Sequence, residues 1–170
     1  GYKLCRPDNI VFTYCGDGDS CAIGLGDLMH AANKGMPITS IMVNNSVFGM
    51  TGGQMAPTTL IGQRATTAPM GRTEELHGKP IRVAEMLSTL DGLVYAERVC
   101  VADIPNIVKA KKAIKKAFTK QMNNEGFTFV EVLCACPTNW GMTTLDANRW
   151  VLDKMAEYYP LGVIKEVADQ

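Results

Sequence analysis

The sequence predicts an α/β fold with a mostly parallel sheet flanked by helices. Short apolar runs typical of buried strands alternate with longer segments of helical character, as in βαβ units. The first two apolar runs are each followed by polar residues, among them Asp17 after the first and Asn45 after the second. Because the carboxyl ends of successive parallel strands lie at one edge of a sheet, this pattern also predicts where a ligand binds.

The first half of the chain is expected to contain two strands, one helix and a long loop. Residues 10–15 and residues 38–43 form apolar runs suited to buried strands. Between them, residues 20–33 are rich in Ala, Leu and Met and precede Gly35-Met-Pro37, which predicts a helix and its end. Residues 46–80 carry many Gly, Thr and Pro without clear periodicity, and a loop of that length is typically functional or disordered.

The next segment is expected to fold as helix, strand and helix. Residues 81–90 predict a short helix and residues 92–100 a strand. Asp103 is suited to cap a helix over residues 104–123. Apolar residues recur in this helix at helical spacing: Ile107, Ala110, Ile114, Ala117 and Phe118.

The last segment is expected to add one strand and one helix. Residues 127–133 are strongly β-prone, and residues 134–143 read as a loop. Residues 144–158 predict a terminal helix, which Pro160-Leu-Gly162 ends before a tail.

Length and composition limit the possible functions. A chain of 170 residues can bury one sizeable core, so residues 1–170 are expected to form a single domain. With 46% hydrophobic and 20% charged residues the chain is globular in type. Its zero formal charge argues against nucleic acid or an acidic membrane surface as main partner, and no apolar run approaches the length of a membrane span. Because the chain starts at Gly1, almost directly on a strand, we expect an N-terminally truncated fragment of a longer subunit.

The six cysteines lie at irregular spacings, which indicates reduced thiols or ligands in a cytoplasmic protein. Cys134 and Cys136 are separated by one residue and do not match a C-x-x-C clamp. Four others are expected to be small buried hydrophobes: Cys5, Cys15, Cys21 and Cys100.

Asp17 and Asn45 form the strongest candidate site. Gly16-Asp17-Gly18 follows the first strand, and Asn44-Asn45 follows the second. Glycine turns let the backbone approach an anion, and the adjoining helix start offers unpaired N–H groups. Carboxylate and amide oxygens suit the octahedral shell of Mg²⁺. The sequence therefore predicts a magnesium-bound diphosphate at this edge.

A dinucleotide site is the simpler alternative, and the motif argues against it. Cys21 stands where G-x-G-x-x-G needs its third glycine. The chain also has no G-x-x-x-x-G-K-[ST] phosphate loop.

The spacing of Gly16-Asp17-Gly18 and Asn44-Asn45 resembles the thiamine-diphosphate signature. The segment from Asn44 to Thr59 (NNSVFGMTGGQMAPTT) is similar to the beta subunit of 2-oxoacid:ferredoxin oxidoreductases that act on 2-oxoglutarate or branched-chain 2-oxoacids. The likeness covers essentially the whole chain and includes further motifs: Gly71-Arg72, Leu76-His77-Gly78, Cys136-Pro-Thr-Asn-Trp-Gly-Met142 and Tyr159-Pro-Leu-Gly162. It implies the thiamine-diphosphate-binding fold.

The resemblance also assigns cofactor contacts. It implies that Mg²⁺ is held by the Asp17 carboxylate, the Asn45 amide and the Val47 backbone carbonyl. The remaining expected contacts to thiamine diphosphate are Gly16, Gly18, Asp19 and Thr51 around the diphosphate, and Gly49 and Met50 near the thiazolium.

By the same resemblance, the reaction is oxidative decarboxylation of a 2-oxoacid with coenzyme A and ferredoxin. An alpha subunit is expected to contribute the activating glutamate beneath the aminopyrimidine. Met50 stands where pyruvate-specific relatives carry asparagine, so we expect a substrate larger than pyruvate. Cys136 is expected to be one ligand of a [4Fe-4S] cluster whose other ligands lie outside this chain.

Other readings stay open at this point. A non-oxidative thiamine decarboxylase or carboligase would share the Asp17 and Asn45 site, and a catalytically idle assembly subunit would keep the fold. His30 is not expected to be catalytic, and His77 is expected to have a structural or subunit-contact role. Six lysines are expected to form a solvated helix face, with docking of acidic ferredoxin as the alternative: Lys109, Lys111, Lys112, Lys115, Lys116 and Lys120.

Overall fold

The computed structural model describes residues 1–168, which fold around a five-stranded sheet. Its strand order is β1 (Phe12–Gly16), β2 (Thr39–Asn44), β6 (Phe127–Leu133), β5 (Leu93–Cys100) and β7 (Gly162–Glu166). The first four strands are parallel, and β7 pairs antiparallel with β5. The predicted α/β fold with a mostly parallel sheet is therefore confirmed.

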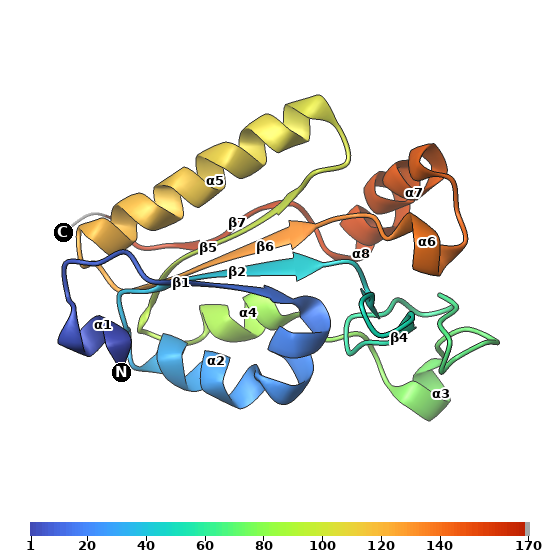
Figure 1. The fold of residues 1–170 in the computed structure, drawn as a ribbon, viewed down its shortest axis with the longest axis horizontal. Helices are drawn as coiled ribbons and strands as arrows, with labels where there is room; N and C mark the ends of the chain where they lie inside the picture. The colour runs from blue at the N-terminus through green and yellow to red at the C-terminus, as the bar shows by residue number, and fades with distance from the viewer. Residues whose placement is uncertain (169–170) are drawn as a thin grey trace.

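Helices cover both faces of the sheet (Figure 1). Helix α5 (Ile104–Met122) lies on one face, and α2 (Leu25–Asn33) and α4 (Val83–Ser88) lie on the other. The short helices α6 (Pro137–Trp140), α7 (Thr144–Trp150) and α8 (Ala156–Tyr158) gather beyond the carboxyl end of β6. The remaining helical segments are α1 (Tyr2–Cys5), α3 (Glu74–His77) and two π-helical turns, Asp19–Ile23 and Val151–Met155.

The central strand β6 explains how the core is built. All seven of its residues are buried. Phe127 and Phe129 pack with the α2 and α4 side of the sheet, whereas Val130 and Val132 pack with α5 on the other side. Side chains of a strand alternate between faces, so one β-prone run supplies both halves of the core.

Helix α5 follows its sequence prediction closely. The Asp103 carboxylate accepts the Asn106 N–H at 2.8 Å, which confirms the predicted N-cap. Five of the six lysines are exposed, but Lys120 is buried and paired with Glu125 at 2.6 Å. Lys120 therefore does not belong to the solvated face, and the prediction was wrong for this residue because its alkyl stem lies on the inward side of the helix.

Several other predictions are corrected by the fold. Residues 10–15 were expected to be a buried strand, but β1 is an edge strand in which Tyr14 is 69% exposed. The predicted loop of residues 46–80 contains a hairpin of β3 (Val47–Phe48) and β4 (Gln54–Met55) as well as α3. The predicted loop of residues 134–143 contains α6, and the predicted tail contains β7. Cys21 and Cys100 are buried as expected, whereas Cys15 is half-buried and Cys5 is exposed.

No helix within residues 1–168 combines the length and the apolar character needed to cross a bilayer.

Candidate functional site

The residues predicted to bind the cofactor surround a single cavity of about 270 Å³ at the carboxyl ends of β1 and β2. Parallel pairing places Gly16 opposite Val43, so the turns that follow both strands meet at this edge. The lining contains all nine predicted residues and Phe48: Gly16, Asp17, Gly18, Asp19, Asn45, Val47, Phe48, Gly49, Met50 and Thr51.

Asp17 is a buried carboxyl group at this edge, 1% exposed. Its Oδ2 accepts a hydrogen bond from the Thr58 hydroxyl. Burial raises the pKa of Asp17 from 3.8 to about 7, while the hydrogen bonds from Thr58 and from backbone N–H groups, including that of Asn45, act in the opposite direction. A buried carboxylate with this environment is stabilised in its charged form by a bound cation.

The second predicted donor set lies in the turn after β2. The Asn45 side chain curls back so that its Oδ1 accepts the Val47 N–H at 3.2 Å. Ser46, between these two residues, is buried and has a φ of 57°. This left-handed conformation reverses the chain within two residues and places both Asn45 and Val47 on the cavity.

Glycine is required at one position of the cavity wall, Gly18, and at one position of the adjoining hairpin, Gly53. A Cβ on Gly18 would lie 2.2 Å from the Phe48 ring, so only glycine lets that ring pack onto the backbone. Gly53 has a φ of 81°, and its N–H donates to the Phe48 carbonyl at 2.8 Å, which closes the hairpin.

Thr58 is a functional candidate that the sequence did not single out. Its hydroxyl donates to Asp17, and its carbonyl accepts the Tyr159 hydroxyl at 2.8 Å. Arg72 holds the same loop by donating to the carbonyls of six residues: Ala56, Pro57, Thr59, His77, Gly78 and Lys79. Both Thr58 and Arg72 lie in motifs that carry the family resemblance, and those motifs were the available sequence signal for these two residues.

Cys136 lies beside the cavity without lining it. Its Sγ accepts the Asn139 Nδ2 at 3.1 Å, and the same amide donates to the Gly49 carbonyl at 3.0 Å. Asn139 therefore joins the start of α6 to the cofactor loop. Burial, with the nearby Asp17 charge, raises the pKa of Cys134 to about 12, which keeps that thiol protonated.

The two histidines lie away from these groups. His30 is exposed on α2. The His77 Nδ1 accepts the Thr73 N–H at 3.1 Å, which ties the two ends of α3 together. Within the described residues 1–168, no cluster of three or more His, Cys, Asp or Glu side chains is placed to hold a metal ion.

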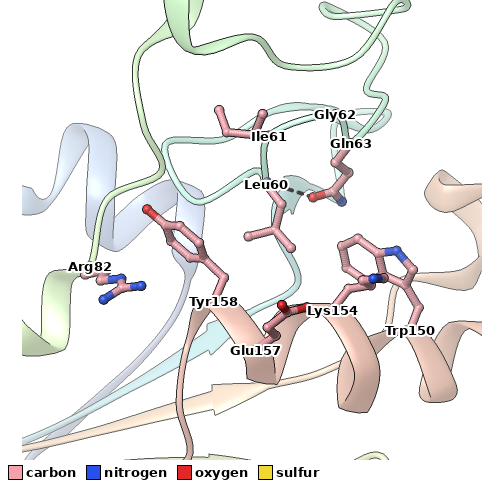
Figure 2. A pocket seen from close by; sticks show the side chains of 9 residues that line it. All are labelled: Leu60, Ile61, Gly62, Gln63, Arg82, Trp150, Lys154, Glu157 and Tyr158. Atoms are coloured by element: carbon pink, nitrogen blue, oxygen red, sulfur yellow. Dashed lines mark hydrogen bonds between the residues drawn. The ribbon is translucent and has the colours of Figure 1, made fainter.

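A larger cleft of about 570 Å³ lies next to this region, between residues 60–63 and the C-terminal helices (Figure 2). Trp150 and Tyr158 line it together with Arg82, whose guanidinium lies 4.5 Å from the Tyr158 ring centre. It contains none of the predicted cofactor ligands, so size alone does not identify the cofactor site.

The residues present fit a magnesium-bound diphosphate. Asp17, Asn45 and Val47 line one cavity and carry a carboxylate, a side-chain amide and a backbone carbonyl, and oxygen is the donor that Mg²⁺ prefers. The raised pKa of Asp17 shows a carboxyl group whose charge no cation of the protein compensates among the described residues. Three glycines, Gly16, Gly18 and Gly49, also line the cavity and allow the close approach that a diphosphate requires.

A mostly parallel sheet with polar side chains at adjoining strand ends is typical of α/β domains that bind a ligand at the carboxyl edge of the sheet. Residues 1–132 match the family described as "Thiamine pyrophosphate enzyme, C-terminal TPP binding domain". The chain belongs to this family, and the dinucleotide alternative is thereby set aside.

Similar curated proteins are oxidoreductase subunits. Ketoisovalerate oxidoreductase subunit VorA of Methanothermobacter thermautotrophicus is 42% identical over 161 residues, covering 95% of this chain and 34% of the relative. 2-Oxoglutarate synthase subunit KorB of Methanocaldococcus jannaschii is 38% identical over 141 residues, covering 83% and 48%. The 2-oxoacid:ferredoxin oxidoreductase subunit beta of Saccharolobus solfataricus is 31% identical over 164 residues, covering 95% and 50%. The chain thus spans between a third and a half of the length of these relatives.

One solved structure has the same fold over the whole chain. It is the 2-oxoglutarate:ferredoxin oxidoreductase from Magnetococcus marinus with 2-oxoglutarate, coenzyme A and succinyl-CoA bound. Its TM-score is 0.75 at 23% sequence identity, and the match covers 100% of this chain and 61% of that one.

Proposed function

We propose that this chain is the thiamine-diphosphate-binding part of the beta subunit of a cytoplasmic 2-oxoacid:ferredoxin oxidoreductase. The observation that carries the proposal is the single cavity in which Asp17, Asn45 and Val47 meet a glycine-rich wall. The names of the similar subunits, which include ketoisovalerate and 2-oxoglutarate enzymes, support the substrate class.

The proposed reaction is oxidative decarboxylation of 2-oxoglutarate or a branched-chain 2-oxoacid. The bond between the carboxyl and carbonyl carbons breaks and releases carbon dioxide, and a thioester bond to coenzyme A forms. Two electrons are transferred to ferredoxin, and one proton is released. Bound thiamine diphosphate supplies the electron sink for the bond cleavage.

The residues of this chain bind and orient the cofactor in this proposal. Asp17, the Asn45 amide and the Val47 carbonyl hold Mg²⁺, and Thr58 keeps the Asp17 carboxylate in place through its hydroxyl. Gly16, Gly18, Asp19 and Thr51 surround the diphosphate, and Gly49 lies nearer the thiazolium. Met50 also lies near the thiazolium in this proposal, and its side chain is fully exposed at the rim of the cavity.

Partners complete the proposed enzyme. The alpha subunit contributes the glutamate beneath the aminopyrimidine, and ferredoxin accepts the electrons. Cys136 is proposed as one ligand of a [4Fe-4S] cluster. Its position next to Gly49, through Asn139, supports this role because a cluster there lies close to the cofactor loop.

Anaerobic assembly with the alpha subunit tests the proposal. We expect coenzyme A-dependent reduction of ferredoxin with 2-oxoglutarate or 2-oxoisovalerate, and none with a folded Asp17→Ala protein. Release of carbon dioxide and aldehyde without ferredoxin reduction would instead identify a non-oxidative decarboxylase. Cofactor binding without turnover of any 2-oxoacid would identify an assembly subunit.

A further inference from the structure

Ser46 is held in its left-handed conformation by all of its polar groups. Its N–H donates to the Asn44 Oδ1 at 3.0 Å, and its carbonyl accepts the Thr59 hydroxyl at 2.5 Å. Its Oγ donates to the Asn45 carbonyl at 2.7 Å and accepts the Gln63 Nε2 at 2.7 Å. A left-handed non-glycine residue is strained and persists only where its surroundings fix it. The turn that presents Asn45 and Val47 therefore depends on these contacts.

Gln63 connects this turn to the larger cleft. Its Oε1 accepts the Leu60 N–H at 2.9 Å, the hydrogen bond drawn in Figure 2. With the oxygen fixed there, the amide must present its NH₂ group to Ser46.

Asn44 is fixed in the same way from the core. It is fully buried, and its Nδ2 donates to the Glu131 Oε1 at 2.7 Å. Burial raises the pKa of Glu131, and the Arg98 charge and the hydrogen bonds from Asn44 and Arg98 act in the opposite direction. Because both Glu131 carboxyl oxygens accept from these donors, Glu131 orients the Asn44 amide with its NH₂ group inward. The Asn44 oxygen is then left facing the Ser46 N–H.

Glu131 is in turn held by Arg98. The Arg98 Nε donates to the Glu131 Oε2 at 2.8 Å, and both side chains are at most 1% exposed. The other side of the guanidinium donates to both Glu85 carboxylate oxygens, at 2.9 and 2.6 Å. Desolvation offsets most of what a buried ion pair contributes to stability, so its main contribution here is a fixed direction.

We propose that Glu131 and Arg98 are positioning residues for the metal-binding turn. They orient Asn44, which holds Ser46 left-handed, and that conformation directs Asn45 and Val47 to the cavity that contains Asp17. The inference rests on the proposed function. It adds to the metal site two buried residues that do not touch the metal ligands and act on them through Asn44 and Ser46.

The substitution Glu131→Gln tests this role with almost no change in side-chain shape. A glutamine must direct its NH₂ group at Asn44 or Arg98, which are both donors, so one hydrogen bond is lost. In the assembled protein we expect the dissociation constant for thiamine diphosphate with Mg²⁺ to rise about 10- to 100-fold, as for other residues that orient metal ligands. We also expect a smaller rise with Ca²⁺, because Ca²⁺ tolerates irregular geometry and Mg²⁺ does not.

Thr128→Val is the matched control. Thr128 lies on the same strand, is equally buried and donates to the Thr39 hydroxyl at 2.9 Å, at the end of β6 away from the cavity. We expect Thr128→Val to lower the melting temperature without changing the ratio of the Mg²⁺ and Ca²⁺ affinities. Isothermal titration calorimetry and thermal unfolding measure both effects.

The outcomes separate the two claims. Wild-type protein without affinity for magnesium thiamine diphosphate would overturn the proposed function itself. Wild-type binding with an unchanged Mg²⁺-to-Ca²⁺ ratio in Glu131→Gln would overturn the positioning role alone. Should Glu131→Gln not fold, Glu85→Gln tests the same series of contacts from its half-exposed end, because Glu85 holds Arg98. A lowered ratio of Mg²⁺ to Ca²⁺ affinity in Glu85→Gln supports the inference, and an unchanged ratio overturns it.

Discussion

Asp17 is a carboxyl group that is almost completely buried away from water. Burial raises its pKa to about 7, so the charged form needs a cation as partner. The described part of the chain does not supply one. Mg²⁺ with a diphosphate is the partner that the oxygen donors around it fit.

Removing this carboxylate should therefore abolish cofactor binding. In Asp17→Ala we expect no magnesium-dependent heat of thiamine diphosphate binding, and in Asn45→Ala a strongly weakened one, because the diphosphate loses donors to its shared cation. Calorimetry of the folded proteins measures this. Asp27→Ala, which removes an exposed carboxylate of α2, should bind as the wild type does. Unchanged affinity in Asp17→Ala would refute the metal assignment.

The raised pKa of Asp17 also predicts how stability depends on pH without cofactor. Well below pH 3.8 the carboxyl is protonated in both states, and between its ordinary value of 3.8 and about 7 the unfolded state loses the proton while the folded state keeps it. Folded stability is therefore lost as pH rises through this range, by up to about 4 kcal/mol. Asp17→Asn removes the titration, so we expect its stability advantage over the wild type to grow from about pH 4 to pH 8.

Urea unfolding of both cofactor-free proteins at several pH values provides the measurement. The difference between the two proteins cancels the titration of every other group that they share. A difference that is constant with pH would contradict the raised pKa.

Met50 carries the substrate prediction. Its side chain is fully exposed at the rim of the cavity and offers no strong hydrogen bond. We expect the assembled enzyme to have a higher kcat/KM for 2-oxoglutarate or a branched-chain 2-oxoacid than for pyruvate. Equal or better use of pyruvate would show that Met50 does not indicate substrate size.

The residues of the cavity were predictable because parallel topology alone brings two strand ends together. Asp17 and Asn45 followed from that rule, and the positions after Asn45 followed from a family resemblance. Thr58 and Asn139 were missed because each reaches the site from a segment without periodicity. Their contacts depend on the tertiary positions of the segment after β4 and of the short helix α6, which no local pattern encodes.

At the scale of elements, Arg72 organises the long segment after the hairpin. The guanidinium satisfies six backbone carbonyls from two stretches of loop. One of these stretches includes Thr58, the hydrogen-bond donor to Asp17. The loop is therefore ordered by one side chain in place of a regular hydrogen-bond ladder.

Replacing this side chain should loosen the loop. We expect Arg72→Met to lower the free energy of unfolding by about 3 kcal/mol, since buried carbonyls lose their donors. Weaker cofactor binding should accompany this loss, because Thr58 is no longer fixed. Arg82→Met is the control, since the Arg82 guanidinium lies over the Tyr158 ring, and urea unfolding compares the two. Equal destabilisation by both substitutions would contradict the role of Arg72.

Element type was predictable where the local pattern was strong, as in the helical spacing of α5 and the β-prone residues of β6. The position of a strand within the sheet was not predictable. An apolar run such as residues 10–15 looks the same whether it lies in the middle of a sheet or at its edge, where β1 is found. β7 was missed because an antiparallel edge strand of five residues carries little pattern of its own.

At the scale of the whole molecule, distant segments converge at one edge of the sheet. The turn after β1, the hairpin after β2 and the start of α6 after β6 come together there (Figure 1). The Asn139 amide joins the last two, with contacts to both Gly49 and Cys136. A redox centre at Cys136 would thus lie beside the cofactor loop.

The cluster prediction follows from this convergence. In the assembled protein, prepared anaerobically, we expect Cys136→Ala to lose the [4Fe-4S] cluster, because a cluster of this type usually needs four thiolates. Cys134→Ala is the matched control. The Cys134 thiol lies only two residues away, but within residues 1–168 it lacks the contact through Asn139 that places Cys136 next to the Gly49 carbonyl. Iron and sulfide analysis with electron paramagnetic resonance should therefore show wild-type content in Cys134→Ala and loss in Cys136→Ala. An intact cluster in Cys136→Ala would refute the ligand assignment while leaving the diphosphate site unaffected, since Cys136 does not line that cavity.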